Sequence, residues 1–466
     1  MKRSPSPPTL SPIRMGEGPA TVAGSILTTA ALGLMLAGCG AHKPKPAVTD
    51  IVYWTGWSGH ELEAQQSLID EFNRTHPTVH VRMLSQFGAS GYQKVRIAFA
   101  GGATPDVMST VWADELAAYA DRGVLTPLDP YLRQSGRDVD REYAPGIAHM
   151  VTIHGHVYGL AVTNSTSFIA YNRDIFKSAG LDPNHPPKII ADLDAASTAC
   201  TKHDARGDFV RYGFRPGGLL LWAYAFGGGW FKSPAPPAPG GVPRNEAGWV
   251  SGQVTANRPE NVRALTWMAS YSRRYDLKRL QGFQSTFGSG STPNGPFYVG
   301  KVAMDVTGEW EREFTRRYAP NLNWGWTGLP CPPGGRPNAT TTGGSVFVIP
   351  DGCKNKEAAW TFLNWISSPH AVGTFCEAIH NIPPLLSVCD EPAFKNDPLY
   401  AYTMPIANGP NSFGPPPTPI WPTYSREIVR AEERAVLGGE DPQRVLDDLQ
   451  IRMAAEQART TKELSE

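Results

Sequence analysis

Aromatic and small polar side chains recur where an expected strand ends and a helix begins. They are Trp54, Trp57 and Ser58, then Thr110 and Trp112, and finally Trp310. Because ligands of open α/β sheets lie outside the carboxyl ends of the strands, we expect these positions to converge on one region. An indole can bury the C–H face of a pyranose, while Asp, Asn and backbone groups satisfy its hydroxyls. The pattern indicates a sugar-binding surface, with the alternative that individual tryptophans are ordinary core residues.

Signatures of several enzyme classes are absent from the sequence. It has no G-x-S-x-G nucleophile elbow, no G-x-x-x-x-G-K-[ST] phosphate loop, and no second histidine after His60-Glu61 to complete a zinc-protease motif. His154 and His156 would share one side of a strand, but no third metal ligand is nearby. A glycosidase needs two carboxylates across the sugar, and nothing in the sequence selects Asp106 or Glu309 for that role. We expect a binding protein with no catalytic residue, metal or cofactor.

The composition is balanced in charge and rich in aromatic residues. The 466 residues include 43 Lys plus Arg and 43 Asp plus Glu, so neither nucleic acid nor an anionic membrane surface is an expected partner. The chain has 13 Trp, 16 Tyr and 18 Phe, and only 18% of its residues are charged. This balance favours a broad recognition surface over a charged catalytic pocket.

The N-terminus has the pattern of an export signal. Lys2, Arg3 and Arg14 precede an apolar run over 21–36, which is too short for a stable membrane-spanning helix. The run ends in Leu-Ala-Gly-Cys, which resembles the lipobox of bacterial lipoproteins and would make Cys39 the lipidated mature N-terminus. We predict a signal peptide over 1–38, a proline-bearing tether over 39–47 and an extracytoplasmic, lipid-anchored protein. A soluble exported protein and a retained N-terminal helix are the alternatives.

Five cysteines remain after Cys39 in an oxidising compartment. The pairing we favour closes two short loops, Cys331 with Cys353 and Cys376 with Cys389, and other pairings remain open. Cys200 lies within a helical pattern and is expected to be a small buried apolar residue.

Strand and helix patterns alternate along the first part of the chain. Strands are predicted over 50–55, 78–84 and 105–110, and helices over 60–74, 91–100 and 114–121. This order predicts a parallel α/β sheet with helices on both faces. Helices over 190–203, 218–226 and 260–275 and an irregular loop over 227–248 follow. In a final helix from Pro442, Val445, Leu449 and Met453 lie on one side. The length of about 430 mature residues favours two lobes with a cleft.

Six ordered segments resemble family 1 extracellular solute-binding proteins, the sugar-type receptors of ABC importers related to maltose-binding protein. They lie at 52–57 (Val-Tyr-Trp-Thr-Gly-Trp), 102–107, 120–128, 158–181, 300–310 with Gly-Glu-Trp at its end, and 343–383. The resemblance covers essentially the whole mature chain. The run over 158–181, which has the pattern of a hinge crossing, is the most specific.

The resemblance implies an α/β receptor with two lobes, several hinge crossings and a ligand cleft between the lobes. Lobe I would comprise 48–162 plus 303–342, and lobe II 163–302 plus 343–466. The implied function is a monomeric receptor that binds a sugar or oligosaccharide and delivers it to the transmembrane subunits of an ABC permease. Two alternatives stay open, a receptor for a polyol phosphate or glycerophosphodiester and a lipid-anchored glycan hydrolase.

The resemblance also assigns ligand contacts residue by residue. They are Trp54, Gly56, Trp57, Ser58, Asp106, Trp112, Asp114, Asn164, Ser165, Trp222, Tyr224, Trp310, Gly343, Gly344 and Ser345. Asp106 could instead end a buried strand. A phosphate ligand would require a cation in the cleft, for which Arg215 and Arg426 are candidates.

Overall fold

The structure is a computed structural model that describes residues 48–86, 89–232, 252–288, 292–416 and 418–465. The predicted signal peptide, Cys39 and the tether lie outside the described residues, as does most of the predicted loop over 227–248. The described chain has two large hydrophobic cores, each built around its own sheet, and a small cluster of Ala117, Ala120 and Ile153. We call the parts of the chain around the two large cores the first and the second lobe.

The first lobe is built from two stretches of the chain. Its elements are β1 (Thr49–Thr55), α1 (Gly59–Thr75), β2 (Val79–Ser85), α2 (Ala89–Gly101), β3 (Val107–Trp112), α3 (Ala113–Asp121), α4 (Asp129–Ser135), α5 (Val139–Glu142), α6 (Pro145–Val151), β4 (Thr152–Ile153), β5 (His156–Val157), β6 (Leu160–Ala161), β15 (Ser345–Val348), α14 (Lys356–Ile366), α15 (Pro369–Ile379), α16 (Leu386–Cys389) and α17 (Pro392–Lys395).

The second lobe holds most of the remaining elements. They are β7 (Phe168–Asn172), α7 (Arg173–Ser178), α8 (Ile190–Cys200), β8 (Lys202–His203), β9 (Phe209–Arg211), α9 (Leu219–Ala225), β10 (Phe231–Lys232), β11 (Gln253–Val254), α11 (Pro259–Arg274), α12 (Leu277–Gln284), β12 (Met304–Thr307), α13 (Glu311–Tyr318), β13 (Trp324–Thr327), β14 (Thr340–Thr341), β16 (Ser412–Phe413), α19 (Trp421–Val436) and α20 (Pro442–Ser465). Helix α18 (Pro398–Ala407) contributes side chains to both cores.

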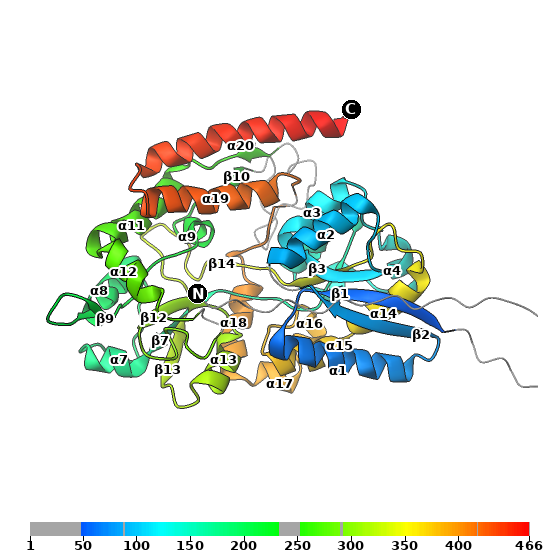
Figure 1. The fold of residues 1–466 in the computed structure, drawn as a ribbon, viewed down its shortest axis with the longest axis horizontal. Helices are drawn as coiled ribbons and strands as arrows, with labels where there is room; N and C mark the ends of the chain where they lie inside the picture. Colours follow the sequence, from blue (N-terminus) through cyan, green and yellow to red (C-terminus); the bar gives the residue numbers. More distant parts are fainter. Residues whose placement is uncertain (1–47, 87–88, 233–251, 289–291, 417, 466) are drawn as a thin grey trace, which may run out of the picture. The chain divides into compact units, whose positions relative to one another are not determined.

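The first sheet has the strand order β2-β1-β3-β15-β6. Strands β2, β1 and β3 are parallel, as predicted, but β15 is antiparallel to its neighbours, so the sheet is mixed. Alternate residues of β1, including Ile51 and Tyr53, are buried, as expected for a strand that covers a core on one face. In Figure 1, α2 and α3 lie on one side of this sheet and α1 and α15 on the other.

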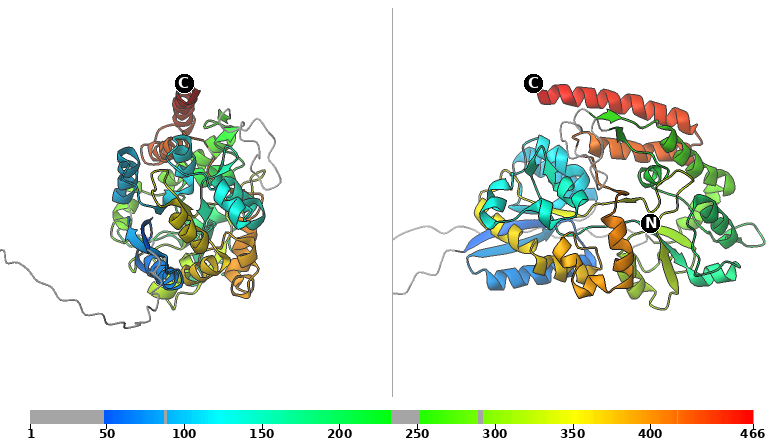
Figure 2. Two further views of the ribbon diagram at one scale, coloured as in Figure 1. Left: turned by 90° about the vertical axis from the view of Figure 1, so that its right-hand side faces the viewer. Right: turned by 180° about the vertical axis from the view of Figure 1, so that it is seen from behind.

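The second sheet is antiparallel, with β7 between β12 and β13. All five residues of β7 are buried. The ring of Tyr171 covers Gly325, where a β-carbon would lie only 2.7 Å from the ring. Helices α19 and α20 run side by side over this lobe (Figure 2). The predicted face of α20 is buried, with Val445, Leu449 and Met453 in the core.

The sheets place two segments differently from the lobe division that the sequence suggested. Strands β12 and β13, from the segment 303–342, pair with β7 of the second lobe. Strand β15, from the segment 343–466, pairs with β3 and β6, and α14 and α15 pack on the first core. The physical reason is strand pairing across the chain crossings, which the sequence pattern does not reveal.

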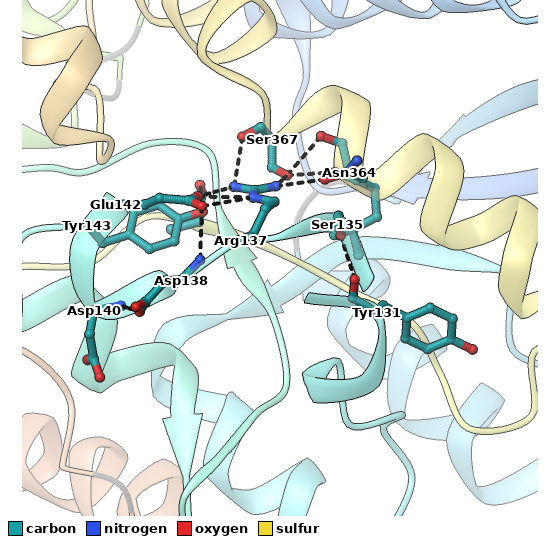
Figure 3. Close-up of polar contacts among 11 residues, drawn as sticks. Tyr131, Ser135, Arg137, Asp138, Asp140, Glu142, Tyr143, Asn364 and Ser367 are labelled. Carbon is teal, nitrogen blue, oxygen red and sulfur yellow. Dashed lines mark hydrogen bonds and ion pairs between the residues drawn. The ribbon is translucent and has the colours of Figure 1, made fainter. Parts of the chain in front are cut away.

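A polar cluster around Arg137 shows that α14 belongs with the first lobe (Figure 3). The guanidinium lies 2.7 Å from Glu142 and donates to the Ser367 hydroxyl at 2.7 Å and to Asn364. Only 12% of the Arg137 side chain is exposed. The cluster therefore ties the segment around α5 to the end of α14, more than 200 residues later in the sequence.

The five described cysteines are free thiols. Cys353 donates to Asp106 in the first lobe, whereas Cys331 pairs through its backbone with Ile189 in the second, so the expected Cys331–Cys353 disulfide is wrong. Cys376 and Cys389 are near each other, because their thiols donate hydrogen bonds to the carbonyl oxygens of the successive residues Ile382 and Pro383. Cys200 is buried, as expected.

The two histidines that the sequence placed on one strand lie in a tight turn between β4 and β5. His154 has a φ of 49°, and its side chain bonds Asp121 at 2.7 Å. His156 lies 3.4 Å from Asp129. Because each histidine faces a different carboxylate, the shared strand face expected from alternation does not exist.

Candidate functional site

A cavity of about 280 Å³ lies between the start of α1 and the helix α13. We call it the α1/α13 cavity. Its lining consists of Gly56, Trp57, Ser58, Gly59, His60, Glu61, Trp310, Glu313, Phe314, Arg317, Tyr318 and Ile379. Trp57 packs against the first core, whereas Phe314 and Tyr318 pack against the second. Both lobes therefore contribute walls to this cavity.

The first wall is the turn that links β1 to α1. The Trp57 backbone N–H donates to the Thr55 hydroxyl, and the Trp57 ring meets the edge of Phe375 at a centroid distance of 5.9 Å. Ser58 occupies the N-cap position of α1, but its side chain forms no capping hydrogen bond. The turn therefore presents an indole and an uncommitted hydroxyl to the cavity.

The second wall is one face of α13. Trp310 precedes the helix, and Glu313, Phe314, Arg317 and Tyr318 follow it three, four, seven and eight residues later. This spacing puts all five side chains on one side of the helix. Phe314 and Tyr318 stack with their rings at an angle of 14°, which gives this wall a broad apolar surface.

Carboxylates outnumber the cation in the cavity. Glu313 is only 4% exposed and lies near His60, His380, Arg316 and Arg317, whose nearest nitrogens are 2.8 to 3.9 Å from it. Burial acts to raise the pKa of Glu313, but Arg316 and the neighbouring cations hold it below its ordinary value. Burial raises the pKa of Glu61. Two carboxyl groups and one guanidinium thus line the cavity.

Four residues assigned to the ligand from the sequence lie together on this lining: Gly56, Trp57, Ser58 and Trp310. The remaining lining residues of α1 and α13 were missed. The α13 residues could have been predicted from the helical spacing of aromatic and charged residues directly after Gly-Glu-Trp. The candidate cations Arg215 and Arg426 bond Gln284 and Thr423 and do not line the cavity.

Other expected contacts are core residues. Trp222 is fully buried, and its indole N–H donates to the Gly217 carbonyl. Tyr224 is buried and stacks on Phe413 at 4.1 Å. Trp54 is half-buried against the first core and does not line the cavity. Sequence alone could not separate Trp54 from Trp57 and Trp310, because all three follow the same local pattern, whereas Trp222 and Tyr224 were assigned only through the family resemblance.

Asp106 has a structural role. One carboxyl oxygen accepts from the Val52 backbone N–H at 2.9 Å, and the other accepts from the Cys353 thiol. Asp106 thus links β1 to the segment that precedes α14. Trp112 and Asp114 belong to β3 and α3, and their side chains lie outside the described residues.

Asn164, Ser165 and Gly343 to Ser345 form the crossing between the lobes instead of the cavity wall. Asn164 is fully buried and accepts at its amide oxygen from Thr342, and the Ser165 hydroxyl donates to the Gly343 carbonyl. The Ser345 backbone N–H donates to the Thr163 hydroxyl at 2.9 Å. These residues fasten two antiparallel chain segments where they pass from one lobe to the other.

Within the described parts of the chain, no three His, Cys, Asp or Glu side chains are grouped so that they could hold a metal ion. No helix of these parts is both long and apolar enough to cross a membrane.

Known proteins with similar sequences and structures are solute-binding proteins. Residues 57–372 match the family described as bacterial extracellular solute-binding protein. The maltotriose-binding protein of Pyrococcus abyssi is 23% identical over 383 residues, which are 79% of this chain and 74% of that protein. The sn-glycerol-3-phosphate-binding periplasmic protein UgpB of Escherichia coli is 25% identical over 358 residues, 73% of this chain and 75% of that protein.

Solved structures agree. The structure of CpMnBP1 with mannotriose bound superposes with a TM-score of 0.75 at 28% identity, over 86% of this chain and 99% of that one. This chain belongs to the family of bacterial extracellular solute-binding proteins. The family and the two-lobe α/β fold expected from the sequence are confirmed.

Proposed function

We propose that this protein is the sugar receptor of an ABC importer and that the α1/α13 cavity binds a neutral sugar or short oligosaccharide. The observation that carries the proposal is the presence of Trp57 and Trp310, from opposite walls, in one cavity. Two indoles can bury the apolar faces of a pyranose, and Glu61, Glu313 and Arg317 can exchange hydrogen bonds with its hydroxyls. A relative named for maltotriose binding and a similar structure with mannotriose bound support this ligand class.

Binding without chemistry is the mechanism that these walls support. A ligand that touches both α1 and α13 binds more strongly when the two lobes are close, so it shifts the population toward the closed form. The closed complex then docks on the permease. Hydroxyl-specific hydrogen bonds supply discrimination, because a buried donor or acceptor left unpaired costs about 1–3 kcal/mol.

Export and anchoring complete the proposal. The basic residues, the apolar run and Leu-Ala-Gly-Cys at 36–39 support removal of a signal peptide and lipidation of Cys39. The tether over 39–47 would then hold the receptor at the extracytoplasmic face of the membrane, near its permease.

A polyol phosphate is the second candidate ligand, favoured by the relationship to UgpB and by Arg317 in the cavity. The two carboxylates beside Arg317 oppose a phosphate group, because like charges in a partly buried site repel. The charge of the lining therefore favours the neutral sugar.

Titration calorimetry of the purified mature protein tests the ligand class. The panel contains mannobiose, mannotriose, maltose, maltotriose and sn-glycerol 3-phosphate. We expect binding of at least one neutral sugar and none of the phosphate. Tight binding of sn-glycerol 3-phosphate alone would replace the sugar proposal with the second candidate, and release of free sugar from an oligosaccharide would establish a hydrolase.

A further inference from the structure

The turn that carries Trp310 is sterically narrow. A β-carbon on Gly308 would lie 2.4 Å from the ring atoms of Trp310, so the indole folds directly over this glycine. The Glu311 backbone N–H donates to the Gly308 carbonyl at 3.0 Å and closes the turn at the start of α13. Glu309 lies between Gly308 and Trp310 in this turn, so the way Glu309 is held affects the direction of the indole in the cavity.

Glu309 is fully buried where the chain crosses between the lobes. One of its carboxyl oxygens accepts from the Thr166 backbone N–H at 3.1 Å, and Thr166 lies in the segment that links β6 to β7. The backbone N–H of Ile382, which belongs to the first core, also faces the carboxyl group. The Ile382 carbonyl accepts from Asn164 in the same crossing segment. Glu309 thus connects the Trp310 turn to the crossing segment that contains Asn164 and Thr166 and to Ile382 of the first core.

The surroundings of Glu309 contain no compensating cation among the described residues. Burial raises its pKa to about 8, against the opposing effect of the Thr166 and Ile382 N–H groups. The other titratable groups that interact with it are the Cys376 thiol of α15 and the Tyr400 phenol of α18. Burial raises the pKa of both, so both are neutral near pH 8.

The second carboxyl oxygen of Glu309 is buried and accepts no hydrogen bond within the described structure. An ionised carboxylate with one unpaired oxygen is much more costly in such a site than the neutral acid, because burial penalises a charge far more than an uncharged polar group. Loss of the proton would favour movement of the carboxyl group toward water, and the Trp310 turn would move with it.

We propose that Glu309 is a positioning residue that acts as a neutral acid, fastening the Trp310 turn to the hinge crossing and so fixing one wall of the ligand cavity. Only the identity of the ligand rests on the proposed function, because the contacts of Glu309 with Thr166 and Ile382 exist in the absence of a ligand. The ligand that we expect to stack on the positioned Trp310 indole is a neutral pyranose.

The first test needs no ligand and compares wild type with Glu309→Gln, which keeps the shape and cannot ionise. A carboxyl group with a raised pKa in the folded state stabilises the fold below its unfolded pKa and loses this contribution as pH rises toward the folded value. Thermal unfolding should therefore show the Tm of wild type falling relative to Glu309→Gln from about pH 5 to about pH 8, with a constant difference above that. Parallel profiles would overturn the neutral-acid assignment.

The second test reports on the indole. The fluorescence of Trp310 is taken as the difference between each protein and its Trp310→Phe counterpart. Glu309→Gln should retain the neutral-pH difference spectrum from about pH 6 to 9.5, whereas wild type should shift above about pH 8. Glu309→Ala should be shifted at every pH. A Glu309→Ala spectrum equal to that of wild type at neutral pH would overturn the positioning role, even if no sugar of the panel binds.

Discussion

A β-carbon on Gly344 would lie 2.0 Å from the carbonyl oxygen of Thr163. The Val162 backbone N–H donates to the Ser345 carbonyl at 3.0 Å, and the Ser345 N–H donates to the Thr163 hydroxyl, so the backbones of the two segments that cross between the lobes are in direct contact. Contacts this close leave no room for a side chain. The close contact at this crossing, on which lobe closure would depend, therefore requires glycine at position 344.

Gly344→Ala should destabilise the fold by about 1–3 kcal/mol, because the added methyl group forces the crossing segments apart. Gly343→Ala is the matched control, since no atom lies within 4 Å of the place that its methyl group would take and its φ is not in the left-handed region. Urea unfolding measures both. Equal stability of the two variants would contradict the steric role of Gly344.

Trp57→Ala and Trp310→Ala should each lower the affinity for the bound sugar by roughly 10- to 100-fold, because each removes about 1.5–3 kcal/mol of stacking and apolar burial. Trp326→Ala is the control, since Trp326 belongs to β13 and is not on the cavity lining. Calorimetry measures all three, with circular dichroism to check the fold. Unchanged affinity in both cavity variants would refute the site assignment.

Binding of the sugar should change less than about twofold between roughly 0.05 and 0.5 M NaCl, because a neutral ligand gains little from charges that salt screens. The guanidinium of Arg317 already faces Glu313 at 3.5 Å. Calorimetry at several salt concentrations checks this prediction. A steep loss of affinity with salt would indicate an anionic ligand.

Arg137→Ala should lower the free energy of unfolding by roughly 2–3 kcal/mol, because Glu142 would lose its partner in a largely buried cluster. This loss is somewhat smaller than for a fully buried ion pair, since 28% of the Glu142 side chain is exposed. Arg141→Ala is the control. The Arg141 side chain is 87% exposed, so its ion pair with Asp138 should contribute less than about 0.5 kcal/mol. Similar effects of the two substitutions in urea unfolding would contradict the importance of the cluster.

Cys376 and Cys389 are free thiols in the structure, and we expect oxidation in the compartment to which the protein is exported to join them while Cys331 and Cys353 stay reduced. The first two thiols are near each other, on the successive carbonyls of Ile382 and Pro383, whereas the other two belong to different lobes. Peptide mass mapping of the unreduced protein from the native compartment measures the connectivity. A Cys331–Cys353 link would require a different packing of the lobes.

Local patterns determined much of this protein from sequence. The strand pattern over 50–55 predicted β1, and the shared face of Val445, Leu449 and Met453 predicted α20. The turn after β1 and the Gly-Glu-Trp motif also placed Trp57 and Trp310 at a candidate site, since strand ends and helix starts are locally encoded.

Only the tertiary structure decided which distant segments meet. It put β12 and β13 beside β7 and β15 beside β3, and it buried Trp222 while leaving Trp310 on a cavity. The reason is that pairing across the lobe crossings depends on backbone hydrogen bonds and close packing between residues far apart in the chain. The same indole and the same strand pattern are compatible with either environment until those contacts form.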